Sequence, residues 1–313
     1  MSGGREALCL DFALRRGGDA IWYALMRKLR IILVFALVGS GHGCAIIRSG
    51  VGRAMAPMAE DLAASLQRQS DVELVREGAP AYLLLLDGLA QSGAPQPKML
   101  LAAAEANTAY AMAFLDQTDR ERARAFHARA RDYGLVVLRR NRHFRAAERA
   151  PMMDYEAAVR TFRKRDVPAL FTTGTAWISW ILSSSDSVEA LAQLGRAVAL
   201  MQRVLELDPD YRMGGAHLFF GLYYAVQPLG AGRDMEKAQA HFQRVFELAG
   251  PDYLLARVTY AEYFARYAFN RELFESTLRE VLAPREDPPE FRLMNAVARL
   301  RARALLDRVE EFF

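Results

Sequence analysis

Cysteine is scarce in this chain of 313 residues, which has two, Cys9 and Cys44. Both lie near the N-terminus, so the body of the chain can form neither a disulfide framework nor a cysteine metal site. The catalytic motifs HExxH, GxSxG and the P-loop are also missing, and no histidine spacing suits a metal. We therefore expect no catalysis, no metal and no cofactor.

Strand signals are equally sparse. Runs of valine and isoleucine are short, apolar and polar residues do not alternate, and Ala, Leu, Glu and Arg dominate. These are strong helix formers, and the apolar residues recur at helical spacing. With 52% hydrophobic and 25% charged residues, the composition is that of a globular protein. The sequence predicts an all-α body.

The body also lacks an excess of either charge. The whole chain has 41 basic and 37 acidic residues, but residues 1–43 contain six of the basic and three of the acidic ones. The remainder has 35 basic against 34 acidic residues. Nucleic-acid affinity depends mainly on neutralising phosphates, so this balance argues against nucleic-acid binding.

The N-terminal region contains an export signal. Residues 26–44 read MRKLRIILVFALVGSGHGC, with a basic start and an apolar stretch too short to span a bilayer. Small residues then lead to Cys44, and this end resembles a bacterial lipobox, although Gly41 replaces its large aliphatic residue. The resemblance implies lipidation of Cys44. A cleaved soluble signal and an uncleaved anchor are the alternatives.

The export signal divides the chain into four parts. Because a signal normally starts a protein, we expect residues 1–25 to be an over-extended start and Met26 to be the true one. Residues 26–43 form the predicted signal peptide, and residues 44–70 a lipid-anchored tether with a short helix. Residues 71–313 form a single helical-repeat domain.

Prolines and small polar residues mark the helix boundaries. Pro80, Pro97 and Pro168 are expected to open helices. Asp119, Asp234 and Asn270 are expected N-caps. Ser187 or Asp186 is expected to cap one helix that ends at Asp208-Pro209. Residues 141–166 are less regular, and we expect one short helix there.

The helices come in pairs, and an acidic-Pro turn after a pair is typical of tetratricopeptide repeats. In such a pair, a small residue of the first helix packs closely against the second. The small residues of the first helices are Gly174, Gly221 and Ala261, and the second helices offer the small residues Ala197 and Ala238 and, in the third pair, Phe274. We predict a superhelical array of degenerate tetratricopeptide-like helical pairs with a C-terminal capping helix.

Such an array has a concave face lined by its first helices. The residues three before, one after and four after each small residue are expected to face this side of the array. They would line a mostly apolar groove for a ligand or partner: Phe171, Thr175, Ile178, Leu218, Leu222, Ala225, Val258, Glu262 and Ala265. Alternatively, the repeats close on themselves and these residues belong to the core.

Arginines cluster between residues 120 and 149. The basic patch consists of Arg120, Arg122, Arg124, Arg129, Arg131, Arg139, Arg140, Arg142 and Arg145. It could dock an acidic partner or lie against anionic headgroups, or it is simply a solvated face. Separately, His217 and His241 are expected to approach each other within one helical pair, where packing is the plainer role.

Several stretches resemble one family. They include DVPALFTTGTAWISWI at 166–181, LMQRVLELDPDYRMGGAHLFFGLYYA at 200–225 and EKAQAHFQRVFELAG at 236–250. Together they resemble the TatT component family of TRAP transporters, which are tripartite and ATP-independent. The resemblance covers roughly residues 44–313.

This resemblance implies a non-catalytic periplasmic lipoprotein with a tetratricopeptide-like fold, held at the membrane through lipid on Cys44. It implies a periplasmic solute-binding protein as the partner, assembly into a homo-trimer, and a concave cavity in each protomer for an apolar or organic-acid ligand. The alternative is a general tetratricopeptide-like protein–protein scaffold of the cell envelope.

Overall fold

The structure is a computed structural model that describes residues 61–91, 96–228, 230 and 232–313. All of these belong to one compact unit, Ala54–Phe313. The predicted over-extended start, the signal peptide and Cys44 lie outside the described residues. Within these residues the regular structure is helical and there is no strand, which confirms the all-α class.

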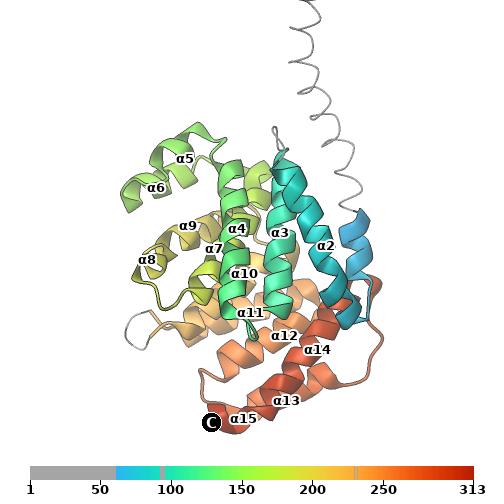
Figure 1. The fold of residues 1–313 in the computed structure, drawn as a ribbon. Coiled ribbons are helices and arrows are strands. Elements are labelled where there is room, and N and C mark those ends of the chain that lie inside the picture. Colours follow the sequence, from blue (N-terminus) through green and yellow to red (C-terminus); the bar gives the residue numbers. More distant parts are fainter. Residues whose placement is uncertain (1–60, 92–95, 229, 231) are drawn as a thin grey trace, which may run out of the picture. The chain divides into compact units, whose positions relative to one another are not determined.

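The elements follow one another with short connections (Figure 1). In chain order they are α2 (Val72–Ala90), α3 (Pro97–Phe114), α4 (Arg120–Leu138), α5 (Arg142–Ala147), α6 (Met152–Val159), the 3₁₀ turn η1 (Lys164–Asp166), α7 (Val167–Ser183), α8 (Val188–Leu191), α9 (Leu194–Leu207), α10 (Tyr211–Val226), α11 (Met235–Ala249), α12 (Leu254–Thr259), the π-helix η2 (Tyr260–Ala265), α13 (Arg271–Leu282), the 3₁₀ turn η3 (Pro289–Phe291), α14 (Arg292–Asp307) and α15 (Val309–Phe312). Residues 61–67 are also helical.

Neighbouring helices pack in series. Helix α2 lies against α3, α3 against α4, α4 against α7, and α7 against α9 (Figure 1). Further along, α10 packs on α11, and η2 packs on both α10 and α13. Helix α14 contacts α12, α13 and also α2, and its Leu293 packs against the cluster that contains Val75 and Tyr110. The last long helix therefore returns to the first.

Side-chain caps fix the starts of several helices. Asp119, Asp234 and Asn270 each accept a hydrogen bond from the backbone N–H three residues later, at 3.1, 2.9 and 2.9 Å. Ser187 caps in the same way at 3.2 Å. These predicted caps are confirmed, and each satisfies a donor that the helix leaves unpaired.

The small residues of the first helices do lie close to the second helices, but the nearest side chains at the two glycines are Met201 and Phe242 rather than Ala197 and Ala238. A Cβ atom on Gly174 would lie 2.7 Å from the sulfur of Met201, and one on Gly221 would lie 2.9 Å from the Phe242 ring. Ala261 is buried in one cluster with Phe274. Small residues at these positions let α7 meet α9, α10 meet α11, and η2 meet α13.

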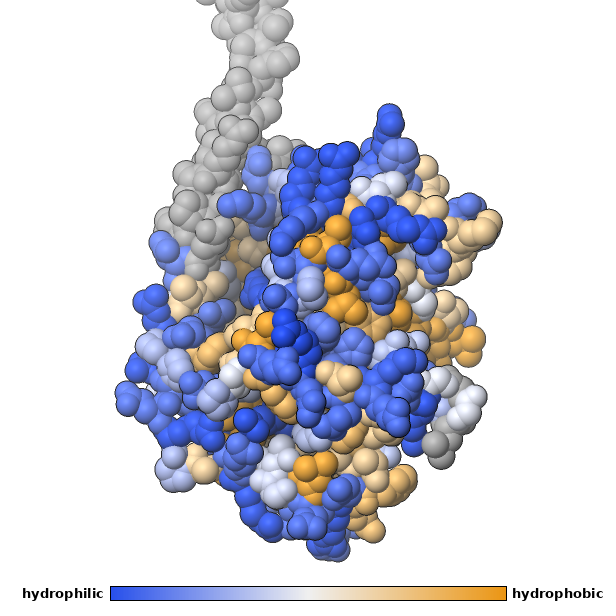
Figure 2. Space-filling model, turned by 180° about the vertical axis from the view of Figure 1, so that it is seen from behind, coloured by the Kyte–Doolittle hydropathy of each residue, from blue (hydrophilic) through white to orange (hydrophobic). Residues whose placement is uncertain are grey.

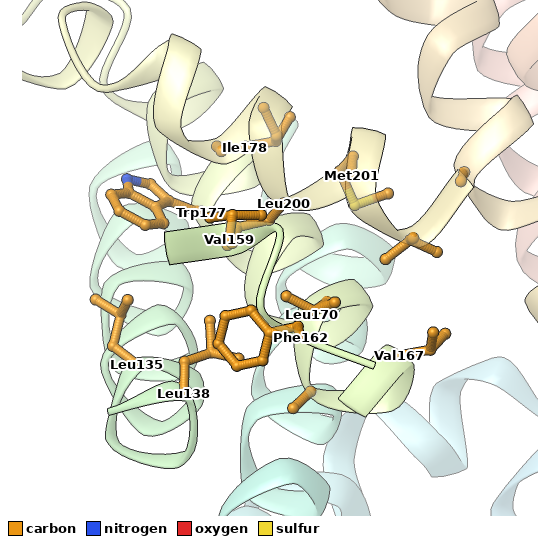
Figure 3. Close-up of a cluster of buried hydrophobic side chains, with 14 of the residues drawn as sticks. Leu135, Leu138, Val159, Phe162, Val167, Leu170, Trp177, Ile178, Leu200 and Met201 are labelled. Atoms are coloured by element: carbon orange, nitrogen blue, oxygen red, sulfur yellow. The ribbon is translucent and has the colours of Figure 1, made fainter. Parts of the chain in front are cut away.

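The largest core cluster joins α4, α6, α7 and α9 around Trp177, Leu170 and Phe162 (Figure 3). Its members are almost fully buried, and Leu170 and Leu200 have no exposed area. This core is continuous across consecutive helices, which is how stacked helical pairs bury their apolar faces.

A closer approach that the sequence did not reveal occurs between α4 and α7. A Cβ on Gly134 would lie 2.2 Å from the Thr173 hydroxyl oxygen and 3.0 Å from the Thr173 Cα atom. We expect Gly134→Ala to lower the free energy of unfolding by about 2–3 kcal/mol, because a backbone atom cannot yield as a side chain can. Chemical denaturation monitored by circular dichroism measures the change.

Gly78 is the matched control, because it also lies inside a helix, α2, but a Cβ there meets no atom within 4 Å. Gly78→Ala should raise the free energy of unfolding by about 0.5–1 kcal/mol through helix propensity alone. A Gly134→Ala protein as stable as the wild type would contradict the close packing of α4 on α7.

The expectation that Pro80 opens a helix is wrong. Helix α2 begins at Val72, is capped by Asp71, and continues through Pro80. Proline lacks the N–H that would bond the carbonyl of Arg76, and the Tyr110 hydroxyl of α3 donates to that carbonyl instead, at 3.3 Å. A tertiary contact thus compensates for the missing local donor.

Two other expectations need correction. The single helix expected after Ser187 is two helices, α8 and α9, separated at residues 192–193. The less regular segment 141–166 contains two helices, α5 and α6, rather than one. Asn141 caps α5 through its side chain, a start signal that the local charge pattern obscured.

Candidate functional site

The nine predicted groove residues lie on α7, α10, α12 and η2, and they do not form one open surface. Five of them are buried: Ile178, Ala225, Val258, Glu262 and Ala265. The other four are partly exposed: Phe171, Thr175, Leu218 and Leu222. We call these four residues the α7–α10 face. The exposed part of the predicted groove is thus confined to α7 and α10.

Phe171 of the α7–α10 face lies where α7 meets the first turn of α10. The ring of Phe171 meets the ring of Tyr211 edge to face, with centroids 5.4 Å apart. A Cβ on Gly215 would lie 2.6 Å from the Phe171 ring, so a larger residue there would displace the ring. Partly exposed apolar side chains on a fixed scaffold are suited to binding an apolar partner surface.

The first turn of α10 is strained. Arg212, Met213 and Gly214 all have positive φ, at 53°, 56° and 77°, and the first two are residues that rarely adopt this conformation. Arg212 forms an ion pair with Glu105 of α3 at 2.6 Å. Strain of this kind persists only where surrounding contacts impose it, and it is often found at functional sites. Sequence reasoning missed this ion pair because its members are far apart in the chain.

Glu262, the one carboxylate of the predicted groove, lies in the π-helix η2 and is nearly buried. It forms an ion pair with Arg301 of α14 at 2.6 Å, and the exposed fractions of the two side chains are 11% and 22%. Arg301 also donates to the Tyr263 hydroxyl at 3.3 Å. Burial, and then the negative charge of Glu262, raise the pKa of Tyr263 to about 12. The pair joins η2 to the last long helix, which is a structural role.

The basic patch is largely engaged within the molecule. Arg120 and Arg124 both donate to the carbonyl of Ser183, at 3.2 and 3.1 Å. Arg124 also pairs with Asp186 at 2.6 Å. Cations at the C-terminus of a helix satisfy free carbonyls and favour its dipole, so these two arginines tie α4 to the end of α7.

Three further arginines of the patch have partners along α4. Arg129 pairs with Asp87 at 2.6 Å, and Arg131 lies over the Trp180 ring at 4.2 Å from its centroid. Arg139 forms a two-point contact with Glu148 at 2.6 Å for both bonds. The Glu148 hydrogen bonds raise the pKa of Arg139. These contacts hold the helices together.

The other four arginines of the patch are exposed. Arg122 lies beside the Phe126 ring, whereas Arg140, Arg142 and Arg145 follow one another around the end of α4 and the start of α5. The patch therefore falls into arginines that contact other parts of the protein and a group of three, Arg140, Arg142 and Arg145, at the end of α4 and the start of α5. The charges of these three are open to a ligand.

His217 of α10 and His241 of α11 meet as expected, with their Nδ1 atoms 2.9 Å apart. The His241 ring stacks on Phe220 and Tyr224, at 5.6 and 5.7 Å between centroids. Burial, and then the positive charge that His217 would carry, lower the pKa of His241 to about 4. Burial and Arg244 also lower the pKa of His217. The pair is neutral at pH 7 and packs as part of an aromatic cluster.

This histidine pair should make stability depend on pH. Because both folded-state pKa values lie below the ordinary 6.5, the unfolded chain takes up protons first as the pH falls. The stability contribution is therefore complete above about pH 6.5 and is lost toward pH 4, by about 1–2 kcal/mol for these partly buried rings. Chemical denaturation at a series of pH values measures it.

His241→Gln should remove most of this pH dependence between pH 6.5 and 4. His143→Gln, at an exposed position of α5, should leave it unchanged. Equal pH profiles for the wild type and His241→Gln would show that the pair does not titrate as the geometry indicates.

No group of three or more His, Cys, Asp or Glu side chains is placed to hold a metal ion among the described residues. Within the same residues, none of the helices has both the length and the apolar character needed to cross a bilayer. Figure 2 shows that the face turned away in Figure 1 is mainly hydrophilic, with apolar residues gathered in several places between the charged ones.

The family to which the chain belongs is shown by one sequence model. The sequence model of the TRAP transporter T-component family matches residues 68–313, which is nearly the whole helical body. A protein of Treponema pallidum (strain Nichols), described as an uncharacterized protein, is 24% identical over 306 residues that cover 87% of this chain and 93% of that protein. The chain belongs to the TRAP transporter T-component family, an accessory component of these transporters.

Proposed function

We propose that this chain is a non-catalytic, lipid-anchored periplasmic subunit that binds the solute-binding protein of a TRAP transporter. In this proposal Cys44 carries the lipid, the helical pairs form a tetratricopeptide-like superhelix, and three copies assemble. The observation that carries the proposal is the family match over residues 68–313, the same part of the chain that folds as one helical body.

The α7–α10 face is the proposed contact for the solute-binding protein. Its four side chains are mostly apolar and partly exposed, and the helices that carry them are fixed by the core around Trp177 and by the Glu105–Arg212 ion pair. A preorganised face loses little conformational freedom on binding. An apolar or organic-acid ligand on the same face is a further part of the proposal.

Co-purification tests the transport role. The full chain is expressed in its own host, solubilised in a non-ionic detergent and isolated, and mass spectrometry identifies the bound proteins and small molecules. We expect a periplasmic solute-binding protein in a fixed ratio to the chain. Recovery of assorted envelope proteins without a solute-binding protein would contradict the proposal and favour a general scaffold.

The same sample tests the proposed anchor and assembly. The mass of the N-terminal peptide should correspond to lipid-modified Cys44, and Cys44→Ala should release the chain from the membrane fraction. Light scattering of the detergent-solubilised protein should give the mass of three chains. A membrane-bound Cys44→Ala protein would contradict the lipid anchor.

A further inference from the structure

A cleft of about 760 Å³ opens where several helices begin or end. The start of α3, the end of α4, the start of α5, η1 and the start of α7 line it. Its volume lies within the range of small-molecule sites, about 300–1,000 Å³. None of the four residues of the α7–α10 face lines it.

The rim of the cleft is positively charged. Lys98, Arg140, Arg163 and Arg165 line it together with one carboxylate, Asp166, which leaves an excess of three positive charges. Asp166 already accepts a hydrogen bond from the backbone N–H of Arg163 at 2.9 Å. Clefts with walls of one charge concentrate ions of the opposite charge.

Arg140 and Arg163 differ from the engaged arginines of α4. Both are exposed, and neither forms an ion pair with a carboxylate in the part of the chain that the structure describes. Arg139, next in the chain to Arg140, has its charge matched by Glu148. The side chains of Arg140 and Arg163 are thus available to an incoming anion.

Two long helices also direct their positive ends toward the cleft. Helix α3 begins at Pro97 and α7 at Val167, and neither start has a side-chain cap hydrogen bond. Pro97, Pro168 and Ala169 from these first turns line the cleft. The prolines have no N–H, and the Val167 N–H already donates to the Lys164 carbonyl, so the contribution of these helix starts is the positive end of each helix dipole.

The floor of the cleft is apolar. Leu101, Leu138 and Phe162 line it, and Figure 3 shows Leu138 and Phe162 next to each other in the large core cluster. Because the core fixes these side chains, the floor is rigid. A cationic rim above an apolar floor matches a molecule with an acidic head and an apolar body.

We propose that this cleft binds a small organic anion that combines a carboxylate with an apolar body. The carboxylate lies between Arg140 and Arg163, and the body covers Leu101 and Phe162. The inference shares the organic-acid ligand class with the function proposed above but assigns a different site, and because 2-naphthoate binding is measured without the solute-binding protein, the two proposals can fail separately.

Calorimetric titration of the full chain with 2-naphthoate tests the proposal. The neutral analogue naphthalene-2-carboxamide has the same body without the charge, and acetate has the charge without the body. We expect 2-naphthoate to bind at least ten times more tightly than either analogue, and its affinity to fall as salt is added. Equal binding of the carboxamide would overturn the proposal.

A pair of matched variants locates the site. Arg140→Gln with Arg163→Gln should weaken 2-naphthoate binding at least tenfold. Arg145→Gln with Arg149→Gln removes the same charge from exposed positions outside the cleft lining and should change affinity less than twofold. Equal losses in both double variants, with unchanged melting temperatures, would show a general charge effect and overturn the proposal.

A lipid surface is the competing occupant for a basic rim. Vesicles of phosphatidylglycerol, tested by co-sedimentation with the same variants, distinguish it. Vesicle binding that requires Arg140 and Arg163, in a protein that does not bind 2-naphthoate, would replace the small anion by a headgroup and contradict the proposal.

Discussion

Replacing Arg301 by methionine is expected to lower the free energy of unfolding by about 3–5 kcal/mol, because Glu262 would be left as a nearly buried carboxylate without its cation. The melting temperature should fall by about 10 °C. Differential scanning calorimetry at pH 7.5 measures both quantities. The effect should be large because Arg301 also donates to the Tyr263 hydroxyl, which then loses its only donor among the described residues.

The double variant Glu262→Leu with Arg301→Met is the control. It removes both charges together, and the loss should shrink to less than about 1.5 kcal/mol, since apolar residues of similar volume often replace a buried pair at little cost. A single variant and a double variant of equal stability would show that the Glu262–Arg301 contact does not couple the two side chains.

Replacing Asp87 by alanine is expected to lower the free energy of unfolding by about 2–4 kcal/mol. The Asp87 carboxylate is nearly buried at the junction of α2, α3 and α4. It accepts from Arg129 at 2.6 Å, from the Tyr133 hydroxyl at 3.1 Å and from the Asn107 amide at 3.1 Å. All three donors lose their partner together, and Asn107 has no exposed area through which water could replace it.

Asp132→Ala is the matched control for Asp87→Ala. Asp132 is a carboxylate on α4 that forms an ion pair with Arg131. The exposed fraction of the Asp132 side chain is 61%, so water reaches this carboxylate. Such pairs contribute little, so the change should stay within about 0.5 kcal/mol. Urea denaturation of both variants gives the comparison. A loss at Asp132 as large as that at Asp87 would contradict the assigned role of the buried junction.

Local signals in the sequence predict the helices well. Asp119, Asp234 and Asn270 cap helices within three residues of themselves, so the sequence alone identifies these starts. The small residues Gly174 and Gly221 were found from the spacing of one repeat pattern, and the structure confirms the approach of the facing helices. These features depend on neighbours along one or two helices.

The missed features depend on distant parts of the chain. Pro80 remains within α2 because Tyr110 of another helix donates to the freed carbonyl. The π-helix η2, in which the N–H of Arg266 bonds the carbonyl of Ala261 at 3.1 Å, has no periodic signal that distinguishes it from an α-helix. Propensity and periodicity carry no information about such contacts.

The arginines show the same limit at the candidate sites. The charge run 120–149 gives no sign that Arg124 is paired with Asp186 and Arg129 with Asp87, whereas Arg140 is exposed. Carboxylates and carbonyls up to 63 positions away in the chain decide this. The groove residues divide in a similar way, since the packing of η2 against α10 and α13 buries Ala225 and Ala265 but not Leu222.

Photo-crosslinking from the α7–α10 face tests the central claim most directly. Benzoylphenylalanine replaces Leu222 in the full chain, and it replaces Leu300 of α14, an exposed leucine away from this face, in the control. After irradiation of intact cells, mass spectrometry identifies the crosslinked proteins. The account predicts a crosslink from position 222 to the solute-binding protein of a TRAP transporter and none from position 300. The opposite pattern, or crosslinks from position 222 only to unrelated envelope proteins, would contradict it.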